Sequence, residues 1–207
     1  MNPQRLIHQE AVPIGPSVSE QIRPDQYRHS HGLDQFLGSL NHADASPCQV
    51  LDIGEFTQAN VAFIIGQGHR LTFEDLLRSF ELPGVPAAER LNHALDFPPA
   101  YFDAILVWDI LEHFPPPVAE SIVPRLHRIL RPGGLLFACF HAEARDNTVD
   151  AYSFRIADGK TLLLQPRGRR KLAQTLNNRS IEKLFSGFDS VKFFLTRDSI
   201  REVIVRK

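Results

Sequence analysis

Short apolar strands alternate with helices between residues 49 and 141, and this alternation limits the possible folds more than any other feature. Gln49–Ile53 and Phe102–Trp108 predict buried strands, and apolar residues at helical spacing follow each of them. Strands that alternate with helices form a parallel sheet with helices on both faces. The sequence therefore predicts an α/β protein, a three-layer sandwich around a mostly parallel, twisted sheet.

Further elements complete this pattern. They are predicted at residues 32–40 (helix), 59–66 (helix), 69–73 (strand), 76–80 (helix), 118–130 (helix) and 135–140 (strand). A third strand within residues 88–95 has a poor signal, and residues 142–178 look irregular, polar and basic. Ser180 is expected to cap a last helix, and residues 191–205 predict a C-terminal antiparallel hairpin.

The chain divides by composition into two predicted parts. Residues 1–47 are expected to form an N-terminal arm and a helix, because the first 30 residues are polar and contain several prolines. Residues 48–207 carry the alternating pattern and are expected to form the α/β domain. No internal repeat is visible.

Charge and cysteine content exclude several classes of function. The 23 Lys and Arg residues balance 24 Asp and Glu residues, so no overall positive field attracts nucleic acid. No apolar stretch approaches the roughly 20 residues of a membrane-spanning helix. Cys48 and Cys139 are too few for a disulfide framework and predict buried thiols in a reducing compartment. We therefore expect a cytoplasmic protein without membrane insertion or a nucleic-acid partner.

Polar residues gather where the predicted parallel strands end. Ligands of such sheets bind beyond the carboxyl ends of the strands. These ends carry Asp52, Gly54, Glu74, Asp75, Asp109 and His141. A small-molecule site is predicted at this edge of the sheet.

Four segments share their order and spacing with a known superfamily. They are residues 50–54 (VLDIG), 73–76 (FEDL), 102–113 (FDAILVWDILEH) and 130–134 (LRPGG). With them the chain resembles the class I S-adenosylmethionine-dependent methyltransferases over residues 48–141, as a divergent branch. Residues 178–207 are similar to the closing helix and hairpin of that fold.

The resemblance implies a set of residues that contact the cofactor. Asp52, Gly54 and Glu55 correspond to the glycine loop at the amino-acid part of S-adenosylmethionine, and Asp75, with Glu74 beside it, to the acid that holds the ribose. Asn92 falls near the adenine position, and Trp108 is expected to form the floor of the cleft. The implied cofactor-binding residues are Asp52, Gly54, Glu55, Phe56, Glu74, Asp75, Asn92 and Trp108.

The loop departs from the family at two positions. Phe56 and Gln58 replace the second and third glycines, which let a backbone approach a ligand closely. The Phe56 ring either packs under the sheet, which leaves room for the cofactor, or fills part of the cleft. Both alternatives remain open at the level of sequence.

Asp109 and His141 are the residues expected near the methyl acceptor. Asp109, Glu112 and His113 share one helical face, and an acid-x-x-Glu-His set holds a divalent metal in some methyltransferases. The alternative, preferred here, is that Glu112 and His113 bond to nearby backbone, so no metal site is predicted. The basic residues within 166–179 are interpreted as a solvated loop.

Three functions are compatible with these observations. The first is a methyltransferase that uses S-adenosylmethionine and acts on a small molecule. The second is a non-catalytic protein of the same fold that binds a protein partner, with a cofactor cleft altered by Phe56 and Gln58. The third, a nucleotide-dependent oxidoreductase, is least favoured because its glycine fingerprint is absent.

Overall fold

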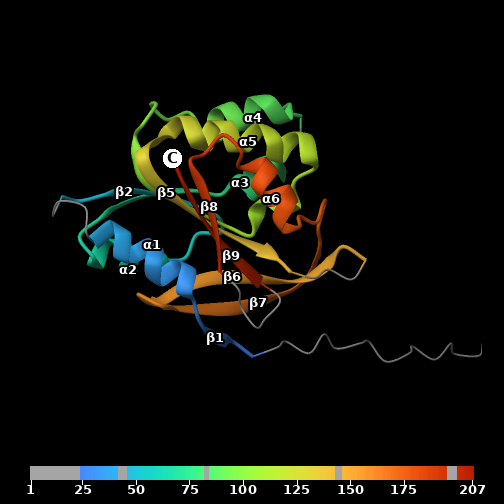
Figure 1. Ribbon diagram of the computed structural model, residues 1–207. Helices are drawn as coiled ribbons and strands as arrows, with labels where there is room; N and C mark the ends of the chain where they lie inside the picture. Colours follow the sequence, from blue (N-terminus) through green and yellow to red (C-terminus); the bar gives the residue numbers. More distant parts are fainter. Residues whose placement is uncertain (1–23, 42–45, 82–83, 143–145, 195–199) are drawn as a thin grey trace, which may run out of the picture.

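Six strands form the main sheet of the protein, in the order β3-β2-β4-β5-β9-β8 (Figure 1). The computed structural model describes residues 24–41, 46–81, 84–142, 146–194 and 200–207. The six strands are β2 (Gln49–Ile53), β3 (Arg70–Glu74), β4 (Phe102–Trp108), β5 (Leu130–His141), β8 (Ser190–Phe194) and β9 (Ile200–Arg206). β2, β3, β4 and β5 pair in parallel, and β9 lies antiparallel between β5 and β8. The predicted fold class and the C-terminal hairpin are confirmed.

Helices cover both faces of this sheet (Figure 1). On one face lie α3 (Leu76–Glu81), α4 (Ala87–Ala94), α5 (Pro116–Ile129) and α6 (Asn178–Leu184), and on the other lie α1 (His31–Asn41) and α2 (Gln58–Gly66). Side chains of a strand alternate between the two faces, so the sheet contributes to two apolar cores. Ile105 and Val107 of β4 belong to one core, and Ala104 and Leu106 belong to the other.

A second, three-stranded antiparallel sheet occupies the region expected to be irregular. Its order is β1-β7-β6, with bounds β1 (Gln26–His29), β6 (Thr148–Asp158) and β7 (Thr161–Lys171). Phe154, Ile156, Leu162 and Leu164 bury one face of it against the core beside α1 and α2. The expectation of an irregular, basic loop over 142–178 was wrong for residues 148–171, because the other face of this hairpin is half-buried or exposed and carries polar residues. Residues 172–177 have no regular structure, as expected, and residues 143–145 lie outside the described chain.

Two local predictions differ from the structure for identifiable reasons. Residues 88–95 fall almost wholly within helix α4 rather than in a third strand, since Ala87, Glu89 and Arg90 are good helix formers that follow Pro86. The cap of α6 is Asn177 rather than Ser180. The Asn177 side chain accepts a hydrogen bond from the backbone N–H of Ser180 at 2.9 Å.

The first residues of β5 explain part of the LRPGG pattern at residues 130–134. A Cβ on Gly134 would lie 2.9 Å from the backbone oxygen of Asp103, so only glycine fits beside β4. The Asp103 carboxylate accepts hydrogen bonds from the Gln49 backbone at 2.7 Å and from the Arg131 guanidinium at 2.5 Å. These residues align the edges of β2, β4 and β5.

The N-terminal elements pack on the rest of the protein. β1 pairs antiparallel with β7, and α1 lies against β5, β8 and β9. Arg28 of β1 donates a hydrogen bond to Glu202 of β9 at 2.7 Å, and both side chains are buried. The domain boundary after residue 47 stays a prediction, and residues 1–23 lie outside the described chain.

Candidate functional site

A cavity of about 340 Å³ opens beyond the carboxyl ends of β2, β3 and β4. This volume lies within the range of pockets that hold small molecules, about 300–1,000 Å³. The β6–β7 hairpin forms its opposite wall. The lining residues are Gly54, Glu55, Asp75, Leu77, Arg78, Trp108, Asp109, Ile110, His113, Ala151, Tyr152, Ser153, Phe154, Arg167 and Arg170.

The cavity brings together five of the ten residues singled out from the sequence: Gly54, Glu55, Asp75, Trp108 and Asp109. The other five, which lie outside its lining, are Asp52, Phe56, Glu74, Asn92 and His141. The site residues contributed by the hairpin were missed, because that segment was interpreted as a loop. Its alternation of apolar residues from Val149 to Ile156 was the available signal.

Asp52 lies beneath the cavity rather than in it. Its carboxylate accepts hydrogen bonds from Trp108 Nε1 at 2.6 Å and from Asn60 Nδ2 at 3.2 Å. Burial raises the pKa of Asp52 to about 6, although these two hydrogen bonds act in the opposite direction. Asp52 therefore holds Trp108 and α2 in place.

Trp108 fills the space in front of Gly54. Its backbone is left-handed, with φ of 50°, and its ring stacks on Phe154 at 5.4 Å. A Cβ on Gly54 would lie 2.8 Å from Cδ1 of the indole. Gly54 is thus required by the Trp108 side chain itself.

Phe56 follows neither of the two alternatives drawn from the sequence. The side chain is 53% exposed, and its ring meets Phe73 edge to face at 5.3 Å. It is absent from the cavity lining. The bulk beside Gly54 comes from Trp108 instead.

Glu74, the last residue of β3, and Asp75, which follows it, have different surroundings. Asp75 lines the cavity, and one of its carboxylate oxygens accepts a hydrogen bond from the Arg78 backbone at 3.0 Å. Glu74 instead accepts one from the Ser79 hydroxyl at 3.1 Å, and burial raises its pKa. Asn92 lies apart, on α4, where it accepts a hydrogen bond from Arg125 of α5.

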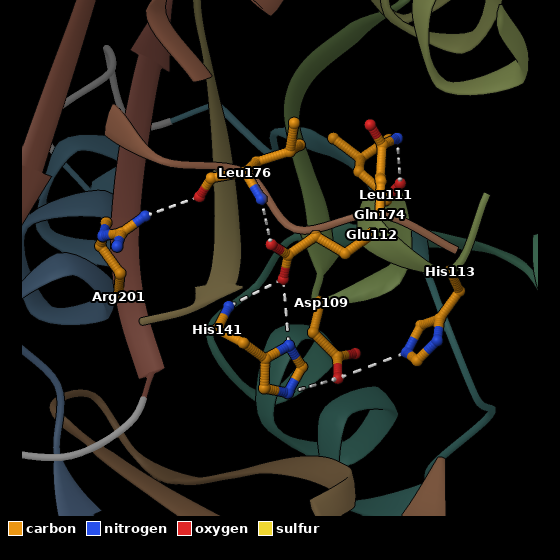
Figure 2. Close-up of polar contacts among 8 residues, drawn as sticks. All are labelled: Asp109, Leu111, Glu112, His113, His141, Gln174, Leu176 and Arg201. Carbon is orange, nitrogen blue, oxygen red and sulfur yellow. Dashed lines mark hydrogen bonds and ion pairs between the residues drawn. The ribbon is translucent and has the colours of Figure 1, made fainter. Parts of the chain in front are cut away.

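A buried polar network connects the cavity to β5 (Figure 2). It begins at Asp109, which follows β4, and includes Glu112 and His113 of the short 3-10 helix η1 (Ile110–His113). Asp109 Oδ2 lies 3.7 Å from His113 Nε2 and 3.8 Å from His141 Nε2. On its other side, His141 Nδ1 lies 3.0 Å from Glu112 Oε2.

Glu112 is fully buried and holds backbone from two other segments (Figure 2). Its carboxylate accepts hydrogen bonds from the backbone N–H groups of His141, at 2.8 Å, and Leu176, at 2.9 Å. Burial lowers the pKa of His141, but the hydrogen bond to Glu112 and the charge of Asp109 outweigh it, and the pKa of His141 is raised. A histidinium between two carboxylates is the arrangement that this environment favours.

Within the acid-x-x-Glu-His set, Glu112 bonds to backbone, as the preferred alternative expected. His113 does not, because its Nε2 lies 3.7 Å from the Asp109 carboxylate and its Nδ1 has no partner among the described residues. No group of three His, Cys, Asp or Glu side chains in the described part of the chain has the arrangement of a metal site.

The basic residues of β7 divide between the cavity and the exterior. Arg167 pairs with Glu55 at 3.0 Å across the cavity mouth. Arg170 also lines the cavity, whereas Arg169 does not. The segment is therefore a wall of the site, not a solvated loop.

Comparisons with known proteins agree with this architecture. Residues 84–138 match the sequence profile of a family described as a methyltransferase domain. No curated protein matches the chain.

Similar solved structures include the 1,6-didemethyltoxoflavin-N1-methyltransferase of Burkholderia thailandensis, determined with 1,6-didemethyltoxoflavin and S-adenosylhomocysteine bound. Its TM-score is 0.50 at 17% identity, over 86% of this chain and 79% of that one. A protein from Pyrococcus horikoshii OT3 also has a TM-score of 0.50, at 14% identity, over 83% of this chain and 88% of that one. At these identities the similarity establishes the fold. No helix in the described residues is long and apolar enough to span a membrane.

Proposed function

We propose that this chain, a divergent member of the class I methyltransferase superfamily, is an S-adenosylmethionine-dependent methyltransferase that acts on a small molecule. The observation that carries the proposal is the position of the cavity. It lies at the carboxyl ends of β2, β3 and β4, where sheets of this kind bind their ligands, and Asp75 and Asp109 both line it.

The residues of the cavity fit the nucleoside half of the cofactor. Asp75 keeps one carboxylate oxygen without a hydrogen-bond partner among the described residues, so it can accept from a ribose hydroxyl. The amino-acid half of the cofactor would need another partner than Asp52, the acid at this position in the family pattern. The Asp52 carboxylate already accepts hydrogen bonds from Trp108 and Asn60. Glu55, which lines the cavity beside Gly54, is the acid that would meet this half of the cofactor.

When bound, S-adenosylmethionine supplies a methyl group on a cationic sulfur, and transfer puts the acceptor's lone pair into the new bond and leaves the C–S electrons on the thioether product. The protein's contribution is to align the acceptor and to accept any proton that it loses. Asp109 lines the cavity and is positioned by His113 and His141, so we assign to it the role of accepting the proton that the methyl acceptor loses. His141 acts behind Asp109 as a positioning residue.

Calorimetric titration with S-adenosylmethionine and S-adenosylhomocysteine tests the proposal. We expect a dissociation constant below about 100 μM, equivalent to about 5.5 kcal/mol of binding. Asp75→Asn should weaken binding about tenfold, because an amide oxygen still caps the Arg78 backbone but loses the charge. Glu74→Gln is the matched control, since this adjacent acid is outside the lining and should leave binding nearly unchanged.

The second candidate, a non-catalytic binding protein of this fold, is favoured by one observation. The Trp108 indole occupies the space beside Gly54 and donates its N–H to Asp52. No binding of either cofactor form at millimolar concentration would favour this candidate and exclude the enzyme. We infer a reducing, cytoplasmic compartment for either function, because the chain has two cysteines, Cys48 and Cys139, both of them buried and too few for a disulfide framework.

A further inference from the structure

A second hollow, of about 350 Å³, adjoins the first cavity at the end of β7. Leu77, His113 and Arg170 line both. A molecule in the second hollow would therefore lie next to His113, whose Nε2 is 3.7 Å from the Asp109 carboxylate. The two hollows form adjoining subsites around one polar junction.

The floor of the second hollow is apolar and formed by packed side chains. Leu77, Phe80, Phe114 and Pro115 line it. The rings of Phe80 and Phe114 meet edge to face at 4.7 Å, and Phe114 is buried. Gln174 Nε2 donates a hydrogen bond to the Phe114 carbonyl at 2.9 Å, which ties this floor to the segment after β7. A flat apolar molecule can rest on such a surface.

The rim of the second hollow is cationic. Arg170 and Lys171 line it, and neither side chain makes a hydrogen bond or ion pair with another described residue. No Asp or Glu occurs among the described residues that line this hollow. Arg167, by contrast, is already paired with Glu55. The positive charge at the rim is therefore available to a ligand, and the complementary ligand is an anion.

We propose that the second hollow is the acceptor subsite and that the acceptor is an aromatic acid. Its ring would pack on Phe80 and Phe114, and its carboxylate would face Arg170 and Lys171. This inference rests on the proposed function, because it names the class of molecule that the methyltransferase would act on. The first cavity is left to the cofactor.

Calorimetry with 2-naphthoate and its uncharged amide, 2-naphthamide, tests the subsite on the full chain. We expect 2-naphthoate to bind about tenfold more tightly than the amide. Arg170→Gln and Lys171→Gln should each weaken 2-naphthoate binding up to about fivefold, since a partly exposed ion pair contributes up to about that factor. Arg169→Gln is the matched control, because Arg169 precedes Arg170 on the same strand and lines neither hollow.

Equal binding of the acid and the amide would overturn the inference, as would an equal loss in Arg169→Gln and Arg170→Gln. A parallel titration with S-adenosylhomocysteine separates the two proposals. If S-adenosylhomocysteine binds and 2-naphthoate shows no preference over the amide, the acceptor class is wrong and the proposed function stands. If only 2-naphthoate binds, with the Arg170 dependence, a subsite that binds aromatic acids is supported and the methyltransferase activity is contradicted.

Discussion

Trp108 decides the shape of the site at the scale of single residues. A non-glycine residue in the left-handed region costs about 1–2 kcal/mol. Trp108 adopts it at the end of β4, and this turns the indole towards Asp52, Gly54 and Phe154. The hydrogen bond to Asp52 and the stacking on Phe154 offset the cost. One side chain thereby joins β2, β4 and the hairpin wall.

Gly54→Ala tests this packing. The added Cβ would lie 2.8 Å from the indole, so the ring must shift, and we expect the free energy of unfolding to fall by about 1–3 kcal/mol. Trp108 is the single tryptophan of the chain, so its fluorescence reports both the shift and the unfolding in urea. Gly38→Ala is the control, because a Cβ there meets nothing within 4 Å and alanine favours helix α1. Unchanged emission and stability in Gly54→Ala would contradict the packing.

The buried carboxyl of Asp52 predicts a dependence of stability on pH. Its pKa rises from 3.8 to about 6 on folding, so the folded protein binds this proton more tightly than the unfolded chain. The contribution to stability is present below about pH 4, is lost as the pH rises to about 6, and amounts to about 3 kcal/mol. Urea unfolding between pH 4 and 7 measures it.

Asp52→Asn provides the comparison for that pH dependence. The variant should be less stable at every pH, since its amide nitrogen must face either Trp108 Nε1 or Asn60 Nδ2. It should also lack the decline between pH 4 and 6. The same decline in both proteins would assign the effect to another group.

At the scale of elements, the sequence predicted the strands of the parallel sheet but not the β6–β7 hairpin. Buried parallel strands such as β2 and β4 are continuous apolar runs, and they were predicted with their bounds. β6 and β7 are buried on one face only, so basic residues on the other face concealed their alternation. The two-residue turn between them, Gly159-Lys160 directly after Asp158, was the missed hairpin signal.

The site was predictable to the same extent as the elements that form it. Asp75 and Asp109 follow strands that were predicted, and both line the cavity. The engagement of Asp52 by Trp108 was not predictable, since it joins residues 56 positions apart through a left-handed backbone. The acid-binding rim at Arg170 and Lys171 depends on the hairpin, and it was missed together with it.

Glu112→Gln tests how η1 is tied to its neighbouring elements. The Glu112 carboxylate accepts from backbone N–H groups of His141 and Leu176, so either orientation of an amide places its NH₂ group against one of them. We expect a loss of about 3 kcal/mol in urea unfolding. The pKa of His141, followed by NMR, should also fall, because the carboxylate that raises it is gone.

The control for this prediction is Glu120→Gln, an exposed acid on α5, which should change stability by less than about 0.5 kcal/mol. The dependence of the free energy of unfolding on pH provides a second test. The stability from a raised histidine pKa is complete below 6.5 and is lost as the pH rises through the pKa of the folded state. That loss should be present in the wild-type protein and reduced in Glu112→Gln. An unchanged His141 titration would refute the role assigned to Glu112.

At the scale of the whole molecule, one buried ion pair joins the N-terminal elements to the far end of the chain. Arg28 of β1 contacts Glu202 of β9, and Glu202 also accepts a hydrogen bond from the Gly32 backbone at 2.8 Å, at the start of α1. β9 is paired on both sides in the main sheet, between β5 and β8. The structure thus predicts that residues 26–41 unfold together with the α/β domain.

Arg28→Met is the variant that tests this coupling. It leaves the Glu202 carboxylate buried without its cation, which costs about 3–5 kcal/mol. Arg28→Met combined with Glu202→Gln should recover part of the loss, because the amide is uncharged and its oxygen still accepts from Gly32. Arg131→Met is the control, since Arg131 is 47% exposed and its pair with Asp103 contributes at most about 1 kcal/mol.

The decisive measurement compares two signals during urea unfolding. Far-ultraviolet circular dichroism follows all helices and strands, whereas Trp108 fluorescence follows the core beside the main sheet. If the N-terminal elements fold with the sheet, both signals move together to lower urea in Arg28→Met. An early dichroism change with an unshifted fluorescence transition would instead show that residues 26–41 unfold separately, and the ion pair would then have no part in the stability of the site.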